Sequence, residues 1–199
     1  DALYVLWYTV KVPFLVYFVF LADRVRSWRF LSAYFCLWIV GVFLAILWPS
    51  VGPIYDTPAL FEGIDAPFAQ QLQTGLWERY QAFIADPGHF GLYDGVAAFP
   101  SLHVGFAALF TASVRRIRVL FWPMVVFTAL ILLGSVALGW HYAVDGYASI
   151  VIAVVLWALM EKVFPAPPNS STPGSEESVG PPTPGLPSGR PDSAKVQPH

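Results

Sequence analysis

Five apolar runs, separated by polar breaks, occupy most of the first 164 residues. They cover about 2–22, 30–48, 100–114, 119–138 and 146–164. A helix of about 20 apolar residues is long enough to cross the hydrocarbon core of a membrane. The run at 100–114 gives only about 22 Å of helix, so we expect its outer end to lie below the membrane surface. The pattern predicts an all-α integral membrane helical bundle with about five spans.

The composition agrees with this class. Hydrophobic residues make up 56% of the chain and charged residues 12%, whereas about a quarter of a soluble domain is charged. The net charge of −2 gives no indication of a nucleic-acid partner. The single cysteine, Cys36, lies inside an apolar run and cannot form an internal disulfide, so redox chemistry is not expected.

Charged residues divide the polar breaks into two kinds. The breaks at 23–29 and 115–118 are rich in arginine, whereas the long connection at 49–98 holds only Arg79 against six acids. Positive loops lie on the cytoplasmic side of most membrane proteins. We therefore expect a multi-pass protein, of the bacterial plasma membrane, whose 49–98 connection is extracytoplasmic. The arginines are Arg24, Arg26, Arg29, Arg115, Arg116 and Arg118, and the acids are Asp56, Glu62, Asp65, Glu78, Asp86 and Asp94.

The outer connection contains an amphipathic segment at about 66–85. Asp65 can cap its start and Pro67 suits its first turn. Apolar residues recur at helical spacing, so we expect an interfacial helix on the membrane surface. The loop that follows contains His89, which we interpret as an ordinary loop residue, and Tyr93 and Asp94, which could contact a head group.

The last segment differs from the rest of the chain. Residues 165–199 are rich in Pro, Ser and Gly, with almost no large apolar side chains, so they cannot bury a core. We therefore expect two parts. Residues 1–164 form a transmembrane catalytic domain and 165–199 a disordered cytoplasmic tail.

A histidine and an aspartate, His141 and Asp145, interrupt the apolar sequence before the last span. If the chain is helical from Tyr142 onward, both lie on one helix face. The carboxylate could then accept a hydrogen bond from one ring nitrogen and leave the other free. The alternative is a structural pair that satisfies itself at a helix end.

A second polar cluster, Ser101 and His103, begins the third run and faces the same outer layer. Free backbone N–H groups at a helix start, a hydroxyl and histidine donors favour a phosphate or carboxylate. Two histidines and an aspartate permit covalent phosphoryl transfer, with one histidine as nucleophile and the other as acid and then base. They equally permit a zinc site. Lys11, deep in the first span, is either functional or snorkels to the interface.

The two clusters resemble a known family. Phe99-Pro100-Ser101-Leu102-His103 and His141-Tyr142-Ala143-Val144-Asp145 resemble the second and third motifs of the type 2 phosphatidic acid phosphatase superfamily. They are most similar to its inositol phosphorylceramide synthase-like branch, where PSLH and HYxxD are typical. The resemblance implies a core of six helices, one of them upstream of Asp1. It also implies that His141 forms a phosphohistidine, that Asp145 orients it, and that His103 is the acid and base, with no metal and no cofactor.

Two departures from the family pattern concern the phosphate-binding cations. Phosphatases of this superfamily carry a Lys–Arg pair in a first motif and an arginine six positions before the nucleophile. Here that position is Ser135, and no such pair precedes Pro100. Residues 48–53 resemble the synthase-like branch, which also lacks the arginine. We expect substrate contacts from Ser101, Tyr142, Arg79 and Lys11.

These features predict a membrane phosphotransferase with an extracytoplasmic site. It would move a phosphorylated head group, such as inositol phosphate, from a phospholipid donor to a lipid or glycolipid hydroxyl. The enzymatic alternative is a lipid or polyprenyl phosphate phosphatase with water as acceptor. The non-enzymatic alternative is a transporter subunit, against which the spans show no repeat and no paired discontinuous helices.

Overall fold

A computed structural model describes residues 2–86 and 96–165 of the chain. These residues belong to one compact unit, Asp1–Ala166. Every named element in the described part is a helix, and its one β-bridge is an isolated pair between Val51 and Ala97. The loop residues 87–95, with His89, Tyr93 and Asp94, and the tail from 166 lie outside the described residues.

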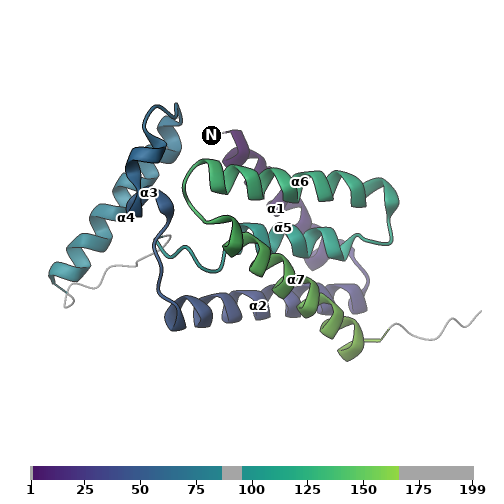
Figure 1. Cartoon of the computed structure of the whole chain (residues 1–199). Helices are drawn as coiled ribbons and strands as arrows, with labels where there is room; N and C mark the ends of the chain where they lie inside the picture. Colours follow the sequence, from purple (N-terminus) through teal and green to yellow (C-terminus); the bar gives the residue numbers. More distant parts are fainter. Residues whose placement is uncertain (1, 87–95, 166–199) are drawn as a thin grey trace, which may run out of the picture. The chain divides into compact units, whose positions relative to one another are not determined.

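The helices follow the apolar runs (Figure 1). Three of them, α2 (Arg24–Leu47), α6 (Arg118–Ala137) and α7 (Ala143–Val163), are long and apolar enough to cross a membrane, and Leu6–Leu21 and Leu102–Ser113 are shorter apolar helices. The predicted all-α membrane bundle is confirmed. Its helices are α1 (Ala2–Val16), continued by the π-helical turn η1 (Tyr17–Leu21), α2 (Arg24–Leu47), α5 (Leu102–Ser113), α6 (Arg118–Ala137) and α7 (Ala143–Val163).

The short helix α5 is the centre of this bundle. It packs against α2, α6 and α7, and every residue from Val104 to Phe110 is buried. Small residues let the neighbouring backbones approach closely. A Cβ on Gly146 of α7 would come within 2.2 Å of a methyl group of Leu132 on α6. Helix α5 can be short because protein surrounds it on several sides.

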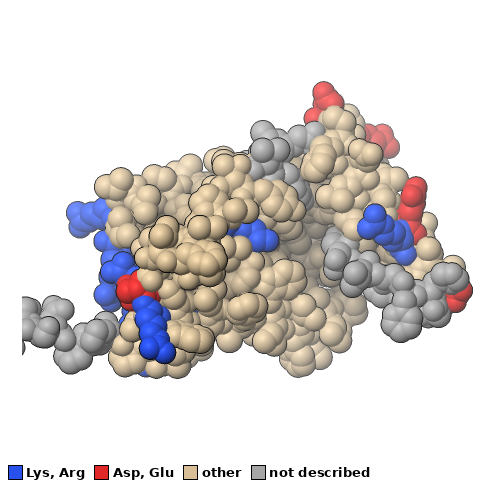
Figure 2. Space-filling view, turned by 180° about the vertical axis from the view of Figure 1, so that it is seen from behind, with Lys and Arg blue, Asp and Glu red and all other residues tan. Residues whose placement is uncertain are grey.

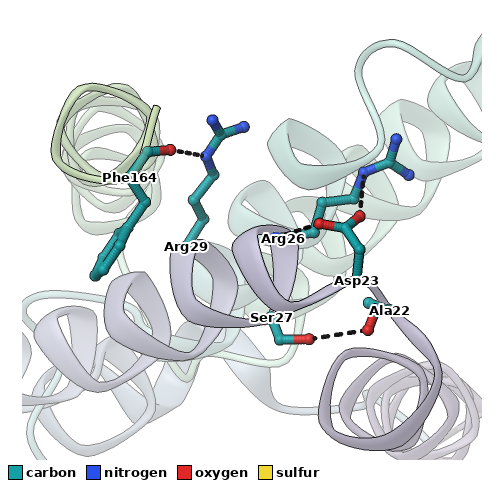
Figure 3. A network of polar contacts seen from close by, with 6 residues as sticks. All are labelled: Ala22, Asp23, Arg26, Ser27, Arg29 and Phe164. Atoms are coloured by element: carbon teal, nitrogen blue, oxygen red, sulfur yellow. Dashed lines mark hydrogen bonds and ion pairs between the residues drawn. The ribbon is translucent and has the colours of Figure 1, made fainter. Parts of the chain in front are cut away.

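The basic breaks and the end of α7 meet at one end of the bundle. Arg29, near the start of α2, is buried, and its Nε donates to the carbonyl oxygen of Phe164 at 2.6 Å (Figure 3). Arg115, which follows α5, pairs with Glu161 of α7. Figure 2 shows most of the visible Lys and Arg toward one end of this face and most Asp and Glu toward the other. The charge asymmetry of the sequence is therefore also an asymmetry of the fold.

The outer connection forms three short or amphipathic elements. They are α3 (Pro53–Asp56), the 3-10 turn η2 (Pro58–Phe61) and α4 (Pro67–Ala85). The predicted helix at 66–85 is present, but Ala66 occupies its N-cap without a side-chain hydrogen bond. The expectation that Asp65 caps α4 is therefore wrong, because the helix starts one residue too late for its carboxylate to reach the first turn.

Candidate active site

His141 lies in the turn between α6 and α7, after Gly139 has reversed the chain with a φ of 73°. Its backbone N–H donates to the carbonyl oxygen of Ser135 at 3.3 Å. Its buried ring places Nδ1 2.6 Å from the carbonyl oxygen of Ala98. Because a carbonyl oxygen can only accept, Nδ1 carries the proton and Nε2 keeps its lone pair. This is the tautomer that a nucleophile at Nε2 requires.

Burial also sets the charge of this ring. It lowers the pKa of His141 to about 4, although the hydrogen bond to Ala98 acts in the opposite direction. The imidazole is therefore neutral at neutral pH. A neutral ring with a free Nε2 can form a bond to phosphorus, whereas a protonated ring cannot.

His103, in the first turn of α5, faces His141 across a small cavity. The cavity encloses about 20 Å³, room for about one water molecule. It brings together α1, α5, α6 and the turn that carries His141, so both histidines line one cavity, whereas Asp145 does not line it. The lining residues are Trp7, His103, Ile131, Gly134, Ser135, Leu138 and His141.

Trp7 is a site residue that the sequence analysis missed. Its buried ring meets the ring of His103 edge-on, with centroids 5.3 Å apart and planes at 64°. Lys11 lies one turn further along α1, with Nζ 6.0 Å from the centroid of Trp7. Lys11 is also close enough to His103 for their charges to interact. The signal in the sequence was the four-residue spacing of Trp7 and Lys11, which puts both on one helix face.

The other cation candidate, Arg79, lies on the exposed side of α4 and lines neither the histidine cavity nor the larger cavity beside Asp145. Ser135, at the position of the phosphatase arginine, donates its hydroxyl to the carbonyl oxygen of Leu132 at 2.9 Å. It lines the histidine cavity but brings no charge. Of the two proposed cations, Lys11 is the one that interacts with His103.

Asp145 differs from its expected arrangement. Its Oδ2 accepts from the backbone N–H of Tyr142, the N-cap residue, at 2.8 Å and so satisfies that N–H at the start of α7. Helix α7 begins only at Ala143, so His141 lies outside it and the i,i+4 geometry does not apply. The carbonyl of Ala98 makes the contact to His141 that we expected from the carboxylate.

A second cavity of about 460 Å³ opens beside Asp145. Most of its lining is apolar and comes from the end of α2 and the segment after it. It therefore offers space for a larger group than the histidine cavity does. The lining residues are Leu44, Leu47, Trp48, Pro49, Ser50, Phe99 and Asp145.

Ser101 and Tyr142 take different positions at this end of the bundle. Ser101 is the N-cap of α5 and fully buried, and its Oγ has no hydrogen-bond partner within the described part of the chain. A buried hydroxyl without a partner is costly, and a ligand oxygen would satisfy it. Tyr142 is exposed and donates its hydroxyl to Asp56 at 3.2 Å.

The alternative of a zinc site depends on the ligand geometry. Within residues 2–86 and 96–165, no three His, Cys, Asp or Glu side chains gather closely enough to hold a metal ion. The carboxylate of Asp145 is bonded to the backbone of Tyr142 instead of joining the two histidines.

Comparison with known proteins places the chain in a family. No curated protein and no solved structure matches it. One family model, described as the PAP2 superfamily, matches residues 2–159, which include both histidines and both cluster motifs. The superfamily expected from these motifs is confirmed. Because the match covers most of its length, the chain belongs to the PAP2 superfamily.

Proposed function

We propose that the protein is a membrane phosphotransferase that moves a phosphorylated head group from a phospholipid to a lipid or glycolipid hydroxyl. Members of the PAP2 superfamily are typically phosphatases and phosphotransferases that act on lipids. The observation that carries the proposal is the state of His141. Its ring is buried and neutral, and its Nδ1–H is fixed on Ala98, which leaves Nε2 available in a cavity that His103 shares.

Transfer proceeds in two steps. In the first, Nε2 of His141 bonds to phosphorus, the bond from phosphorus to the leaving alcohol breaks, and His103, which enters the cycle protonated, donates its proton to that oxygen and becomes neutral. The cationic phosphohistidine is stabilised by its Nδ1–H bond to Ala98. In the second, the acceptor hydroxyl gives its proton to His103 and attacks phosphorus. The P–N bond then breaks and returns neutral His141.

Lys11 and Ser101 are the residues we propose for binding phosphate oxygens. Lys11 supplies positive charge beside His103 from a span where a lysine is costly. Ser101 supplies a buried hydroxyl at the start of α5 that no described residue satisfies. Together they would make the phosphate contacts of the family arginine, whose position is occupied here by Ser135.

The second cavity supports a lipid as the substrate. At about 460 Å³, with a mostly apolar lining beside Asp145, it is large enough for part of a lipid substrate. The resemblance of the PSLH and HYxxD motifs to the inositol phosphorylceramide synthase-like branch suggests inositol phosphate as the head group. One observation favours hydrolysis as the second candidate. The histidine cavity of about 20 Å³ has the volume of one water molecule, which could act as acceptor.

We propose that the active-site end faces the extracytoplasmic side of a bacterial plasma membrane. The support is the gathering of arginines at the opposite end, where Arg29 meets Phe164 and Arg115 meets Glu161. Since α7 ends there, the segment after residue 165 would start on the cytoplasmic side.

The proposal is tested by trapping the intermediate. Purified protein is mixed with an aryl phosphodiester, with and without a chelator, and the phosphorylated site is located by mass spectrometry under mildly basic conditions. We expect acid-labile phosphate on His141 with or without the chelator. The His103→Ala variant should still be phosphorylated by the aryl ester, whose leaving group needs no proton, but should fail with an alkyl ester.

Three results would contradict the proposal. They are phosphate on His103, equal losses for both ester types in His103→Ala, and a reaction that stops on chelation and returns with zinc. Transfer is separated from hydrolysis by supplying a lipid alcohol and measuring whether phosphodiester product or free phosphate monoester accumulates.

A further inference from the structure

The turn that carries His141 is hydrogen-bonded to the outer connection, the segment at 49–98 that contains α3 and α4. Gln73, on the buried face of α4, is 4% exposed, although glutamine is mostly a surface residue. Its side-chain Nε2 donates to the backbone carbonyl oxygen of Leu138 at 2.7 Å. We propose that Gln73 is a positioning residue, which fixes the Leu138–His141 turn and thereby the ring of His141. This inference rests on the proposed role of His141.

The backbone around Gln73 is itself fixed. The hydroxyl of Tyr55 donates to the carbonyl oxygen of Gln73 at 3.1 Å. Burial raises the pKa of Tyr55 to about 12, so this hydroxyl stays protonated and remains a donor. The ring of Tyr55 also stacks on Trp77 of α4, with centroids 4.7 Å apart and planes at 11°. These contacts fix the backbone of Gln73 and therefore the position from which its side-chain amide reaches the turn.

The turn is contacted at its next residue as well. The backbone N–H of Ile54 donates to the carbonyl oxygen of Gly139 at 3.0 Å. A Cβ on Gly139 would lie 2.9 Å from Ile54 and from the ring of Phe61, so the outer connection is packed tightly against it. With Gln73 on Leu138 and Ile54 on Gly139, two consecutive carbonyls before Trp140 are held by the connection.

These contacts explain how α4 can influence chemistry that it does not touch. The phosphoryl step depends on the placement of Nε2, and a displacement of about 1 Å at a reacting group can cost about 100-fold in rate. The contact with Ala98 fixes the rotation of the His141 ring, whereas the position of the His141 Cα depends on the turn. Gln73 supplies a side-chain bond to that turn from an element far away in sequence.

The test compares two glutamines of the same helix. Gln73→Met keeps the length of the side chain and removes the amide. Gln70→Met is the matched control, because Gln70 also donates to a carbonyl, that of Ile64 at 2.8 Å, outside the turn. With an aryl phosphodiester as the substrate, we expect Gln73→Met to lower kcat by about 10-fold to 100-fold with little change in KM. Gln70→Met should stay close to wild type.

A third variant gives a readout that general destabilisation would not produce. In Gln73→Glu, a carboxylate cannot donate to the carbonyl of Leu138, but the protonated acid can. Its kcat relative to wild type should therefore be low at pH 8 and recover toward pH 5. Equal kcat values for Gln73→Met and Gln70→Met, or a constant ratio of Gln73→Glu to wild type across this range, would overturn the positioning role.

Hydrogen exchange separates this inference from the proposed function. Exchange at the backbone amides of Trp140 and His141 should be faster in Gln73→Met than in Gln70→Met, whatever reaction the protein catalyses. If wild type lacks activity but this difference is present, the proposed function fails and the inference that Gln73 fixes the turn is retained. If wild type is active and neither exchange nor kcat responds to Gln73→Met, the inference fails alone.

Discussion

Replacing Asp145 by asparagine distinguishes two accounts of how His141, the proposed nucleophile, is oriented. In hydrolase triads the aspartate fixes the tautomer of the histidine and stabilises its charged form, and its change to asparagine costs about 10⁴-fold in rate. In this structure the carbonyl of Ala98 fixes the tautomer, and Asp145 accepts from the backbone of Tyr142. The two arrangements predict very different losses.

The expected loss follows from the contact that Asp145 makes. An asparagine oxygen can still accept from the N–H of Tyr142 at the start of α7, so the hydrogen bond survives without its charge. Hydrogen bonds to charged groups exceed neutral ones by about 1 kcal/mol, and the helix-dipole interaction is part of this difference because it arises from the same terminal N–H groups. If all of about 1 kcal/mol reached the transition state, the rate would fall about 5-fold.

The assay measures kcat/KM for wild type and Asp145→Asn with an aryl phosphodiester, alongside thermal melts in the same detergent. Asp56→Asn is the matched control, because this exposed carboxylate also accepts a hydrogen bond, from the hydroxyl of Tyr142. We expect a loss of about 5-fold for Asp145→Asn and almost none for the control. A loss near 10⁴-fold in a protein that melts normally would show that Asp145 reaches His141 during catalysis and would refute the Ala98 account.

Two further predictions concern pH and topology. Burial lowers the pKa of His141 to about 4, so the neutral form of this proposed nucleophile persists as the pH falls. In His103→Ala, kcat/KM for a singly charged aryl phosphodiester should stay flat from pH 8 to pH 5, and a half-loss near the ordinary histidine pKa of about 6.5 would contradict this. In a Cys36→Ser background, Glu62→Cys should react with an impermeant maleimide on intact cells and Ile117→Cys only after permeabilisation; the reverse pattern would invert the proposed orientation.

Local sequence was enough to locate the helices and the two histidines. Apolar runs of helical length predicted the spans, and the structure begins and ends α6 and α7 within a few residues of the predicted bounds. Apolar periodicity alone could not say which helix lies inside the bundle. Lipid and protein core both favour apolar side chains, so the central position of α5 came only from the fold.

The contacts of the candidate site could not be predicted from the sequence as readily as the helices. The partner of His141 is the backbone carbonyl of Ala98, 43 residues away. Because every residue has a backbone carbonyl, no residue type in the sequence could indicate this contact. Asp145 was expected to act on His141 because four residues separate them. That inference required a continuous helix, and the turn at Gly139 delays the start of α7 until Ala143.

The sequence by itself determined that this is an all-α membrane bundle with two histidines at one end and arginines at the other. These properties depend on hydrophobicity and charge, which act over one helix at a time. Only the tertiary structure decided that Ala98 contacts the ring of His141, that Trp7 lines the histidine cavity from α1, and that Gln73 donates to the carbonyl of Leu138. Each of these contacts joins segments far apart in the chain, and the packing of the helices brings them within hydrogen-bonding or van der Waals distance.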